Sequence, residues 1–199
     1  MDITWLGDKS FTISDELINV IVNPTDSTVD SSIINDDTVL IYTEQGLEYN
    51  SKLTTVNSPG EYEINNASIH GVANAVTSND NRSISTCYRI ESRGLSIAVV
   101  GMIGSAFDSE ALSVLASSQV ILFSPDNSNV DSEILANTIR SIEPRKIIIS
   151  GYDKSSSKPS KSLESIIKVL GLKDYEPKNK ASFTISSFGD SQETIILEK

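Results

Sequence analysis

The side chains best suited to chemistry are scarce in this sequence, whose 199 residues include one histidine and one cysteine. A cysteine nucleophile needs a base beside it, and His70 is the one imidazole that could serve Cys87. Nothing in their spacing brings the two side chains together. We interpret His70 as a surface or half-buried residue of the alternating run 67–72, and Cys87 as a small strand residue. A single cysteine also excludes a disulfide framework within the chain.

Charge and composition exclude several classes of partner. The formal net charge is -11, and no long run of lysine or arginine occurs. The most basic stretch, residues 154–161, is mostly serine and indicates a solvated loop. An acidic surface repels phosphate backbones, so we expect no nucleic-acid partner. The first residues begin as a strand rather than a signal peptide, and no apolar run reaches membrane length. We therefore expect a cytoplasmic protein with no membrane partner.

Short β-strands dominate the first half of the sequence. Residues 3–6 and 10–13 predict a hairpin that turns at residues 7–9, because two apolar alternating runs flank a glycine-containing turn. Further apolar or alternating runs predict strands at 17–22, 38–42, 61–64, 67–72, 86–91 and 96–100.

Helices and strands alternate in the second half. Capping residues and apolar periodicity predict helices at 108–116, 131–142 and 160–170, the last of them closed by Gly171. Apolar runs predict strands at 120–123 and 147–149, and residues 183–187 and 194–197 predict a closing β pair. This order suits an α/β (α+β) fold with mixed sheets covered by helices, and the length suits a single domain over residues 1–199.

Several fragments then occur in a particular order along nearly the whole chain. They are residues 3–7 with Phe11, Ser-Pro-Gly-Glu-Tyr-Glu at 58–63, 88–91 with 94–97, Gly-Met-Ile-Gly at 101–104 and 142–145. In this order they resemble the metallo-β-lactamase superfamily, in the branch of the L-ascorbate phosphate lactonases and related metal-dependent hydrolases. The resemblance implies a four-layer αβ/βα sandwich of two mixed sheets, and it implies hydrolysis by a pair of zinc ions.

The resemblance also implies where the zinc ligands should stand, and here they are missing. The histidines of the family's His-x-His-x-Asp-His loop correspond to Glu44, Gly46 and Tyr49, and its aspartate corresponds to Glu48. No histidine occurs near residues 75–76, where the family has another.

The remaining ligand positions are altered as well. Met102 stands in place of the bridging aspartate, Gly151 in place of the last histidine, and Asp8 in place of the histidine that often follows the first glycine. A chain with one histidine cannot build a zinc pair of the family's type. We expect these loops to converge at one edge of the sandwich, with Tyr49 and Met102 filling part of the metal volume.

Two functions from different classes stay open. The first is a non-catalytic member of the fold, without a cofactor, that acts as a binding or assembly subunit and pairs with itself or with a paralogue. The alternative is a hydrolase whose site is rebuilt from Asp8, Glu44 and Glu48 around magnesium or manganese, which prefer oxygen ligands. Three solvated acids on loops would leave no such site, so we favour the first function and expect no zinc-dependent hydrolysis.

Overall fold

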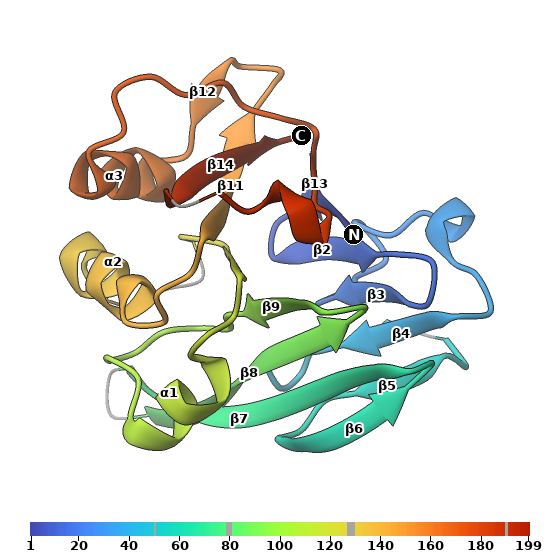
Figure 1. The fold of residues 1–199 in the computed structure, drawn as a ribbon. Coiled ribbons are helices and arrows are strands. Elements are labelled where there is room, and N and C mark those ends of the chain that lie inside the picture. The colour runs from blue at the N-terminus through green and yellow to red at the C-terminus, as the bar shows by residue number, and fades with distance from the viewer. Residues whose placement is uncertain (50, 79–80, 127–129, 190) are drawn as a thin grey trace.

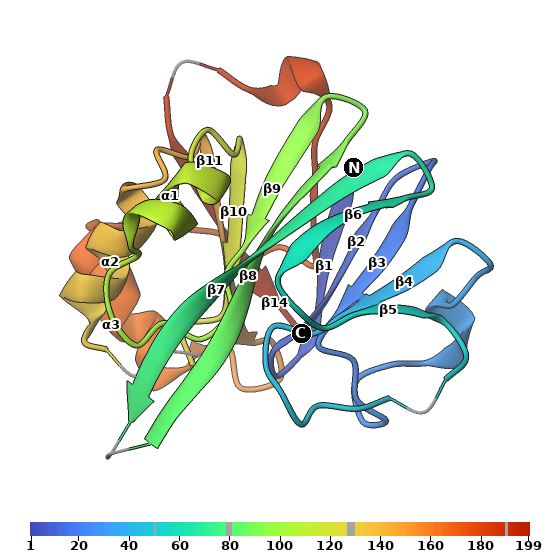
Figure 2. The same cartoon turned by 90° about the horizontal axis from the view of Figure 1, so that it is seen from below.

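Two β-sheets pack face to face in the computed structural model, and helices cover the outer face of one sheet (Figures 1 and 2). The structure describes residues 1–49, 51–78, 81–126, 130–189 and 191–199. Both sheets combine parallel and antiparallel strands, which confirms the predicted sandwich of mixed sheets.

The six-stranded sheet is built mainly from the first third of the chain. Its spatial order is β13 (Lys180–Ser182), β1 (Asp2–Gly7), β2 (Ser10–Ser14), β3 (Asn19–Val22), β4 (Thr38–Ile41) and β5 (Thr54–Val56). The pairs β3–β4 and β4–β5 are parallel, so β3, β4 and β5 end at the same edge.

The eight-stranded sheet takes its strands from the middle and the end of the chain. Its order is β12 (Lys158–Pro159), β11 (Lys146–Asp153), β10 (Val120–Phe123), β9 (Leu95–Val99), β8 (Asn81–Ser92), β7 (Ala67–Ser78) and β6 (Gly60–Ile64), and β14 (Glu193–Glu198) also pairs with β11. Strands β9, β10, β11 and β14 are parallel to one another.

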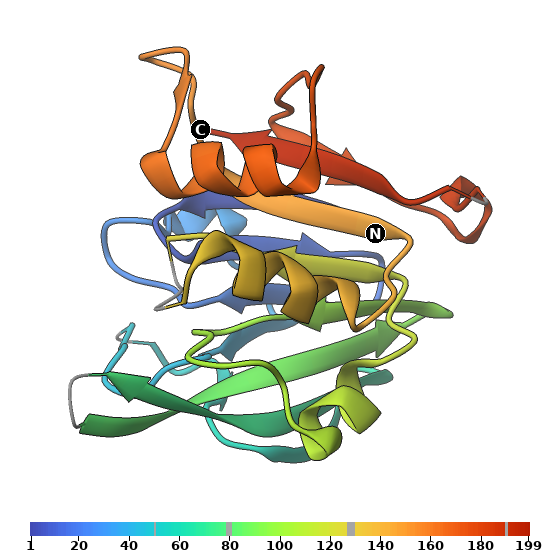
Figure 3. The ribbon, with the colours of Figure 1, turned by 90° about the vertical axis from the view of Figure 1, so that its left-hand side faces the viewer.

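Three capped helices lie on the outer face of the eight-stranded sheet (Figure 3). They are α1 (Ser109–Leu115), α2 (Ser132–Arg140) and α3 (Lys161–Leu170), and each follows an N-cap residue, Asp108, Asp131 or Ser160, which is the first residue of a predicted helix. Each cap side chain accepts a hydrogen bond from a first-turn amide, which satisfies a donor that the helix itself leaves unpaired. Within the described residues, none of the helices has the length and apolar character of a membrane span.

Alternation along the strands divides the core into layers. Val120 and Leu122 belong to the cluster between the two sheets, whereas Ile121 and Phe123 belong to the cluster beneath the helices. This alternation follows from the two-residue period of a strand, and burying each such side chain contributes roughly 1.5–3 kcal/mol.

The outer face of the six-stranded sheet has a thinner cover. Within the described residues it carries a 3-10 turn, η1 (Ser31–Ile33), and loops rather than an α-helix. A small apolar cluster lies between this cover and the sheet. It is formed by Ile21, Leu40 and Tyr42 of the sheet side, and Val29, Ile33, Ile34, Leu47, Tyr49 and Leu53 pack against it. The loop at residues 44–49 is therefore part of this cover.

The predicted closing β pair is wrong. Residues 185–187 form a second 3-10 turn, η2 (Ile185–Ser187), and the strand β13 precedes them and pairs with β1. Strand β14 instead pairs with β11 in parallel. Side-chain hydrogen bonds explain the turn, because Thr184 N donates to Ser187 Oγ at 2.9 Å and such local bonds compete with strand pairing. Asp190, which falls between the two runs predicted to pair, lies outside the described residues.

Candidate functional site

An ion pair joins two of the strand-end loops that the resemblance assigns to the metal site. Lys9 belongs to the β1–β2 turn, and Glu44 follows β4. The Lys9 Nζ donates to Glu44 Oε1 at 3.0 Å and to Oε2 at 2.9 Å. The side chains are 33% and 17% exposed, so both charges are partly withdrawn from water. Because both oxygens of Glu44 accept hydrogen bonds from one ammonium, the Lys9 side chain already balances the charge of this carboxylate.

Neutral hydrogen bonds join the same loops beneath the ion pair. Asn23, which follows β3, accepts from Thr43 N at 2.8 Å and donates its Nδ2 to Thr43 Oγ1 at 2.9 Å. On β8, Ser85 donates its hydroxyl to Thr43 O at 3.0 Å and accepts from Met102 N at 2.8 Å. Asn74 of β7 donates to Met102 O at 3.0 Å. Because Asn23, Thr43 and Ser85 are buried, these bonds fix the relative positions of the loops.

Gly101 permits the close approach on which this network depends. A Cβ built at Gly101 would lie 2.2 Å from Ser85 Oγ and 2.9 Å from Thr43 Cβ, which is closer than real Cβ contacts. The glycine thus lets the segment after β9 lie directly against the buried serine and threonine.

Gly151 sits at a bend of β11 that suits glycine. Its φ is 112°, a backbone conformation that side-chain-bearing residues rarely adopt. Its carbonyl accepts from Ser160 N at 2.7 Å, and a Cβ there would lie 3.1 Å from Ser160 Oγ. A histidine at this position would therefore need a different backbone conformation. Relative to the family's pattern, both the ligand side chain and the backbone conformation differ here.

Two hollows flank the ion pair. A hollow of about 740 Å³ is lined by Lys9, Asp8 and Gly151, together with the ends of β11 and β12. A second, of about 820 Å³, is lined by Glu44 and the loop that follows it, including Gly46, Glu48 and Tyr49. Lys9 lines the first hollow and Glu44 the second, so the ion pair lies between them.

The structure thus brings most of the predicted positions to one edge without joining them into one site. Asp8 and Gly151 line one hollow, while Glu44, Gly46, Glu48 and Tyr49 line the other. Met102 connects to the Glu44 side through Ser85. Tyr49 N donates to Tyr42 OH at 2.8 Å, and its ring packs on the outer cluster of the six-stranded sheet.

The donors present do not fit a pair of zinc ions. Zinc takes about four nitrogen, sulfur or oxygen ligands at roughly 2.0–2.3 Å. In the described part of the chain, no group of three or more histidine, cysteine, aspartate or glutamate side chains is placed to hold a metal. Gly151 offers no side chain, Glu44 is bound to Lys9, and the Lys9 ammonium would repel a second cation. The carboxylates of Asp8, Glu44 and Glu48 are included in this result.

The two reactive side chains singled out in the sequence lie elsewhere. His70, on β7, faces Glu61 of β6, with 3.8 Å between His70 Nε2 and Glu61 Oε1, and it is 41% exposed. Cys87 is buried in the cluster beneath the helices. Burial raises the pKa of the Cys87 thiol to about 12, which disfavours the nucleophilic thiolate.

Sequence reasoning missed the residues that hold this edge together. Lys9 and Glu44 are 35 residues apart, and Ser85 and Thr43 are 42 apart, so no local pattern pairs them. One signal was present: Asn23-Pro24 directly after an apolar strand is typical of a turn, and Asn23 adopts the left-handed φ of 47° that asparagine tolerates.

Comparisons with known proteins agree with the architecture. A family model described as "Beta-lactamase superfamily domain" matches residues 2–149. A search of curated protein sequences gives no match. Among solved structures, a proposed Zn-dependent hydrolase of the metallo-β-lactamase superfamily from Thermotoga maritima superposes with a TM-score of 0.72 at 20% identity, covering 100% of both chains.

Two further structures share the fold at lower identity. The metallo hydrolase Igni18 from Ignicoccus hospitalis gives a TM-score of 0.60 at 12% identity, over 92% of this chain and 99% of that one. A proposed metal-dependent hydrolase from Parabacteroides distasonis gives 0.58 at 12% identity, over 98% and 91%. With the family model matching residues 2–149 and two mixed sheets packed face to face, the chain belongs to the metallo-β-lactamase superfamily.

Proposed function

We propose that this chain is a non-catalytic member of the superfamily that works as a binding or assembly subunit. The observation that carries the proposal is the Lys9–Glu44 ion pair, in which a lysine ammonium contacts a carboxylate at a position that the resemblance assigns to a metal ligand. A superfamily hydrolase gains its nucleophile from metal-bound water, whose pKa falls to about 7 beside zinc. A lysine ammonium offers no open coordination position and cannot replace that function.

The internal contacts of the edge support the same function. In the metal-bound members the ions would link the loops, whereas here Asn23, Thr43 and Ser85 link them through buried neutral hydrogen bonds. The loops can therefore keep their positions without a metal. A scaffold that keeps its shape but lacks metal ligands is suited to binding rather than to hydrolysis.

The proposal extends to the form of the subunit. We expect the chain to pair with itself or with a paralogue, without nucleic acid and without a resident cofactor. Light scattering coupled to size-exclusion chromatography measures this directly, and a strictly monomeric chain at micromolar concentration would remove the self-paired form.

Elemental analysis tests the central proposal. We expect protein purified without chelators to hold well below one zinc, manganese or magnesium ion per chain. We also expect no zinc-dependent hydrolysis of esters, lactones, β-lactams or phosphodiesters. Stoichiometric metal together with turnover that a chelator abolishes and added metal restores would overturn the proposal.

Matched variants would then identify the site responsible. If Glu44→Gln or Glu48→Gln removed both metal and turnover, the hydrolase with a rebuilt carboxylate site would be the correct account. Glu61→Gln is the control, because Glu61 is 82% exposed on β6 and outside both hollows.

A further inference from the structure

Strands β7 and β8 form a hairpin arm that extends past the strands beside them. Strand β7 pairs with β6 over residues 67–71, and β8 pairs with β9 over residues 88–92. The two strands stay paired with each other out to Ser78 and Asn81. Figure 2 shows this arm projecting from the rest of the molecule. Residues 72–78 of β7 are therefore a sheet edge without a neighbouring strand, which we call the open edge.

The register shows which backbone groups point to the open edge. Thr86 N donates to Thr43 O at 2.7 Å, on the side of β8 away from β7. Ala73 lies opposite Thr86, so both residues of this pair direct their N–H and C=O groups outward. Because the pattern repeats every two residues, Ala75 and Thr77 point the same way as Ala73. Within the described residues, the backbone groups of Ala73 and Ala75 have no hydrogen-bond partner.

The body of the molecule holds one face of the arm in place. Val72, Asn74 and Val76 are buried, and Asn74 Nδ2 donates to Met102 O at 3.0 Å. The opposite face is open to solvent.

This open face is apolar. Ala73 and Ala75 are exposed, and Ile84 is 53% exposed. Ala75 and Ile84 are direct cross-strand neighbours, so they form a short apolar row that reaches the open edge.

Other edges of the sheets carry features that hinder pairing with another chain. Proteins protect sheet edges with charged residues, proline or very short strands. Strand β5 has three residues, β12 consists of Lys158 and Pro159, and β6 carries Glu61 and Glu63. The β8 side of the arm includes Arg82.

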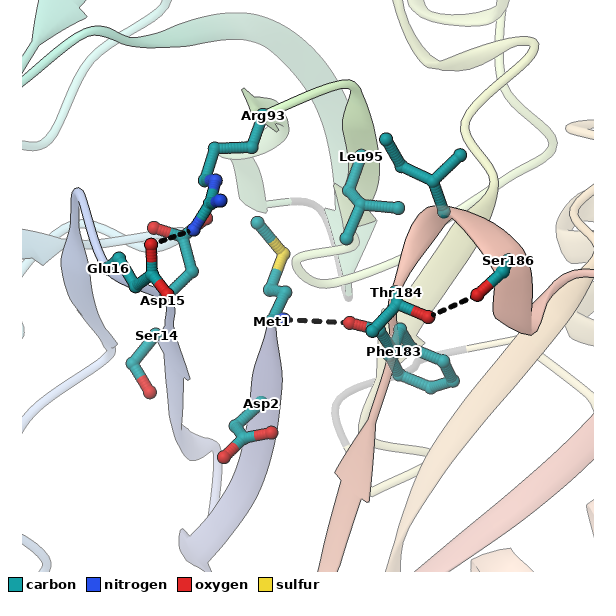
Figure 4. Close-up of a pocket in the computed structure, with 11 residues that line it drawn as sticks. Met1, Asp2, Ser14, Asp15, Glu16, Arg93, Leu95, Phe183, Thr184 and Ser186 are labelled. Carbon is teal, nitrogen blue, oxygen red and sulfur yellow. Dashed lines mark hydrogen bonds and ion pairs between the residues drawn. The ribbon is translucent and has the colours of Figure 1, made fainter.

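The edges near the two termini are closed as well. Strand β13 covers the outer edge of β1, and the Met1 amino group donates to Phe183 O at 2.8 Å directly after that pair (Figure 4). Strand β13 itself has three residues and includes Lys180. Along β14, Lys178 N donates to Ile196 O at 2.9 Å, so this edge is also occupied.

The open edge has none of these features. Residues 72–78 are Val-Ala-Asn-Ala-Val-Thr-Ser, without charge, proline or glycine. Free N–H and C=O groups on such a segment are a template for an added strand. The net charge of -11 makes two copies of the chain repel each other, and an uncharged edge is where they approach at the lowest electrostatic cost. An antiparallel edge is also complementary to itself, which suits a twofold pair.

We propose that a second copy of this chain pairs its β7 with the open edge, antiparallel about a twofold axis at Ala75. Ala75 then faces its own counterpart, and Ala73 faces Thr77 of the second copy. Three outward-facing residues from each chain form about six backbone hydrogen bonds. The apolar rows of Ala75 and Ile84 continue across the interface on one face. This inference names the surface for the self-pairing proposed above, and it rests on that part of the proposed function.

Ala75→Pro is the informative variant. Its N–H points to the open edge, so proline removes no hydrogen bond within the chain and blocks pairing with a second copy. Ala75→Lys is the second variant, because it keeps the backbone and places two ammonium groups side by side at the twofold axis. Thr54→Lys is the control, since it makes the same charge change at an exposed residue of β5.

Light scattering coupled to size-exclusion chromatography over a concentration series measures the self-association. We expect a dimer for the unmodified chain and for Thr54→Lys, and dimerisation about tenfold or more weaker in both Ala75 variants. Amide hydrogen exchange gives the location. The amides of Ala73 and Ala75 should exchange slowly in the dimer and rapidly on dilution.

The outcomes separate this inference from the proposed function. A dimer of unchanged affinity in Ala75→Lys would overturn the open edge as the interface and leave self-pairing intact. A strictly monomeric unmodified chain would overturn both. Assembly that grows beyond the dimer would also overturn the proposal, because twofold pairing uses the open edge of both copies and closes. Metal content and turnover decide the non-catalytic function independently of these measurements.

Discussion

Removing the Lys9–Glu44 pair should destabilise the fold by a predictable amount. Lys9→Met keeps the aliphatic stem, and Glu44→Gln keeps the shape of the carboxylate. Exposed ion pairs contribute about 0.2–1 kcal/mol, and hydrogen bonds to charged groups about 1.5–3 kcal/mol. Because the two side chains are 33% and 17% exposed and joined by two bonds, we expect each variant to lose roughly 1–2 kcal/mol of unfolding free energy.

The double variant should lose little more than either single variant, which gives a coupling energy of about 1–2 kcal/mol. Urea unfolding followed by fluorescence measures it, since Trp5 is the one tryptophan and lines the same hollow as Lys9. In a domain of this size each kcal/mol of this coupling corresponds to roughly 2–4 °C in Tm.

The matched control is the pair Glu164–Lys168 on α3, whose side chains are 56% and 72% exposed and lie one helical turn apart. Its coupling should be about 0.3–0.5 kcal/mol. If the Lys9–Glu44 variants were additive, or coupled no more strongly than this control, the ion pair would not hold the loops together.

Three other variants and measurements probe other parts of the molecule. Gly101→Ala should lose about 1–3 kcal/mol of unfolding free energy, because its Cβ would lie 2.2 Å from Ser85 Oγ; Gly189→Ala, with open space around it, is the control in urea unfolding. Cys87 should resist a thiol reagent at pH 8 in the folded protein and react on unfolding, since burial raises its pKa to about 12; rapid modification of folded protein would contradict this. A hydrogen bond from Lys180 of β13 lowers the pKa of the Asp2 carboxyl below its usual value of 3.8. The contribution of Asp2 to stability is therefore present above pH 3.8 and is lost as the pH falls through the folded pKa. Asp2→Asn should flatten this part of an acid-unfolding curve.

Local sequence patterns predicted most of the helices and strands, because the residues that begin, end and line each of them are close together in the sequence. The caps Asp108, Asp131 and Ser160 each precede a helix, and Gly171 ends α3 with a φ of 71°. The alternation of apolar and polar residues likewise identified strands on both sheets.

The elements that the sequence patterns predicted wrongly or missed also have physical explanations. The run at residues 183–187 contains apolar residues at a strand-like spacing, but its hydroxyl groups form a capping box instead. Strand β5 has only three residues, two of them exposed, so its burial pattern is too short to recognise.

The positions of the candidate site rest on resemblance, and the contacts between them could not be predicted. Positions 8, 44–49, 102 and 151 could be assigned by resemblance, because the scaffold places its strand-end loops. The contacts of Lys9 with Glu44 and of Ser85 with Thr43 depend on three-dimensional packing between distant segments. Alignment to a family position gives the residue type there, but it does not show which neighbouring side chain that residue contacts.

The strand order also bears on how the chain folds during synthesis. Strand β1 pairs with β13, and β11 pairs with β14, so both sheets receive a strand from residues 180–198, far along the chain from their partners. Until these residues leave the ribosome, the outer edge of β1 and one edge of β11 have no partner. Contacts between such distant residues slow folding, and open strand edges invite pairing with other chains. We therefore expect nascent chains of this protein to depend on chaperones until β13 and β14 have been synthesised and have emerged.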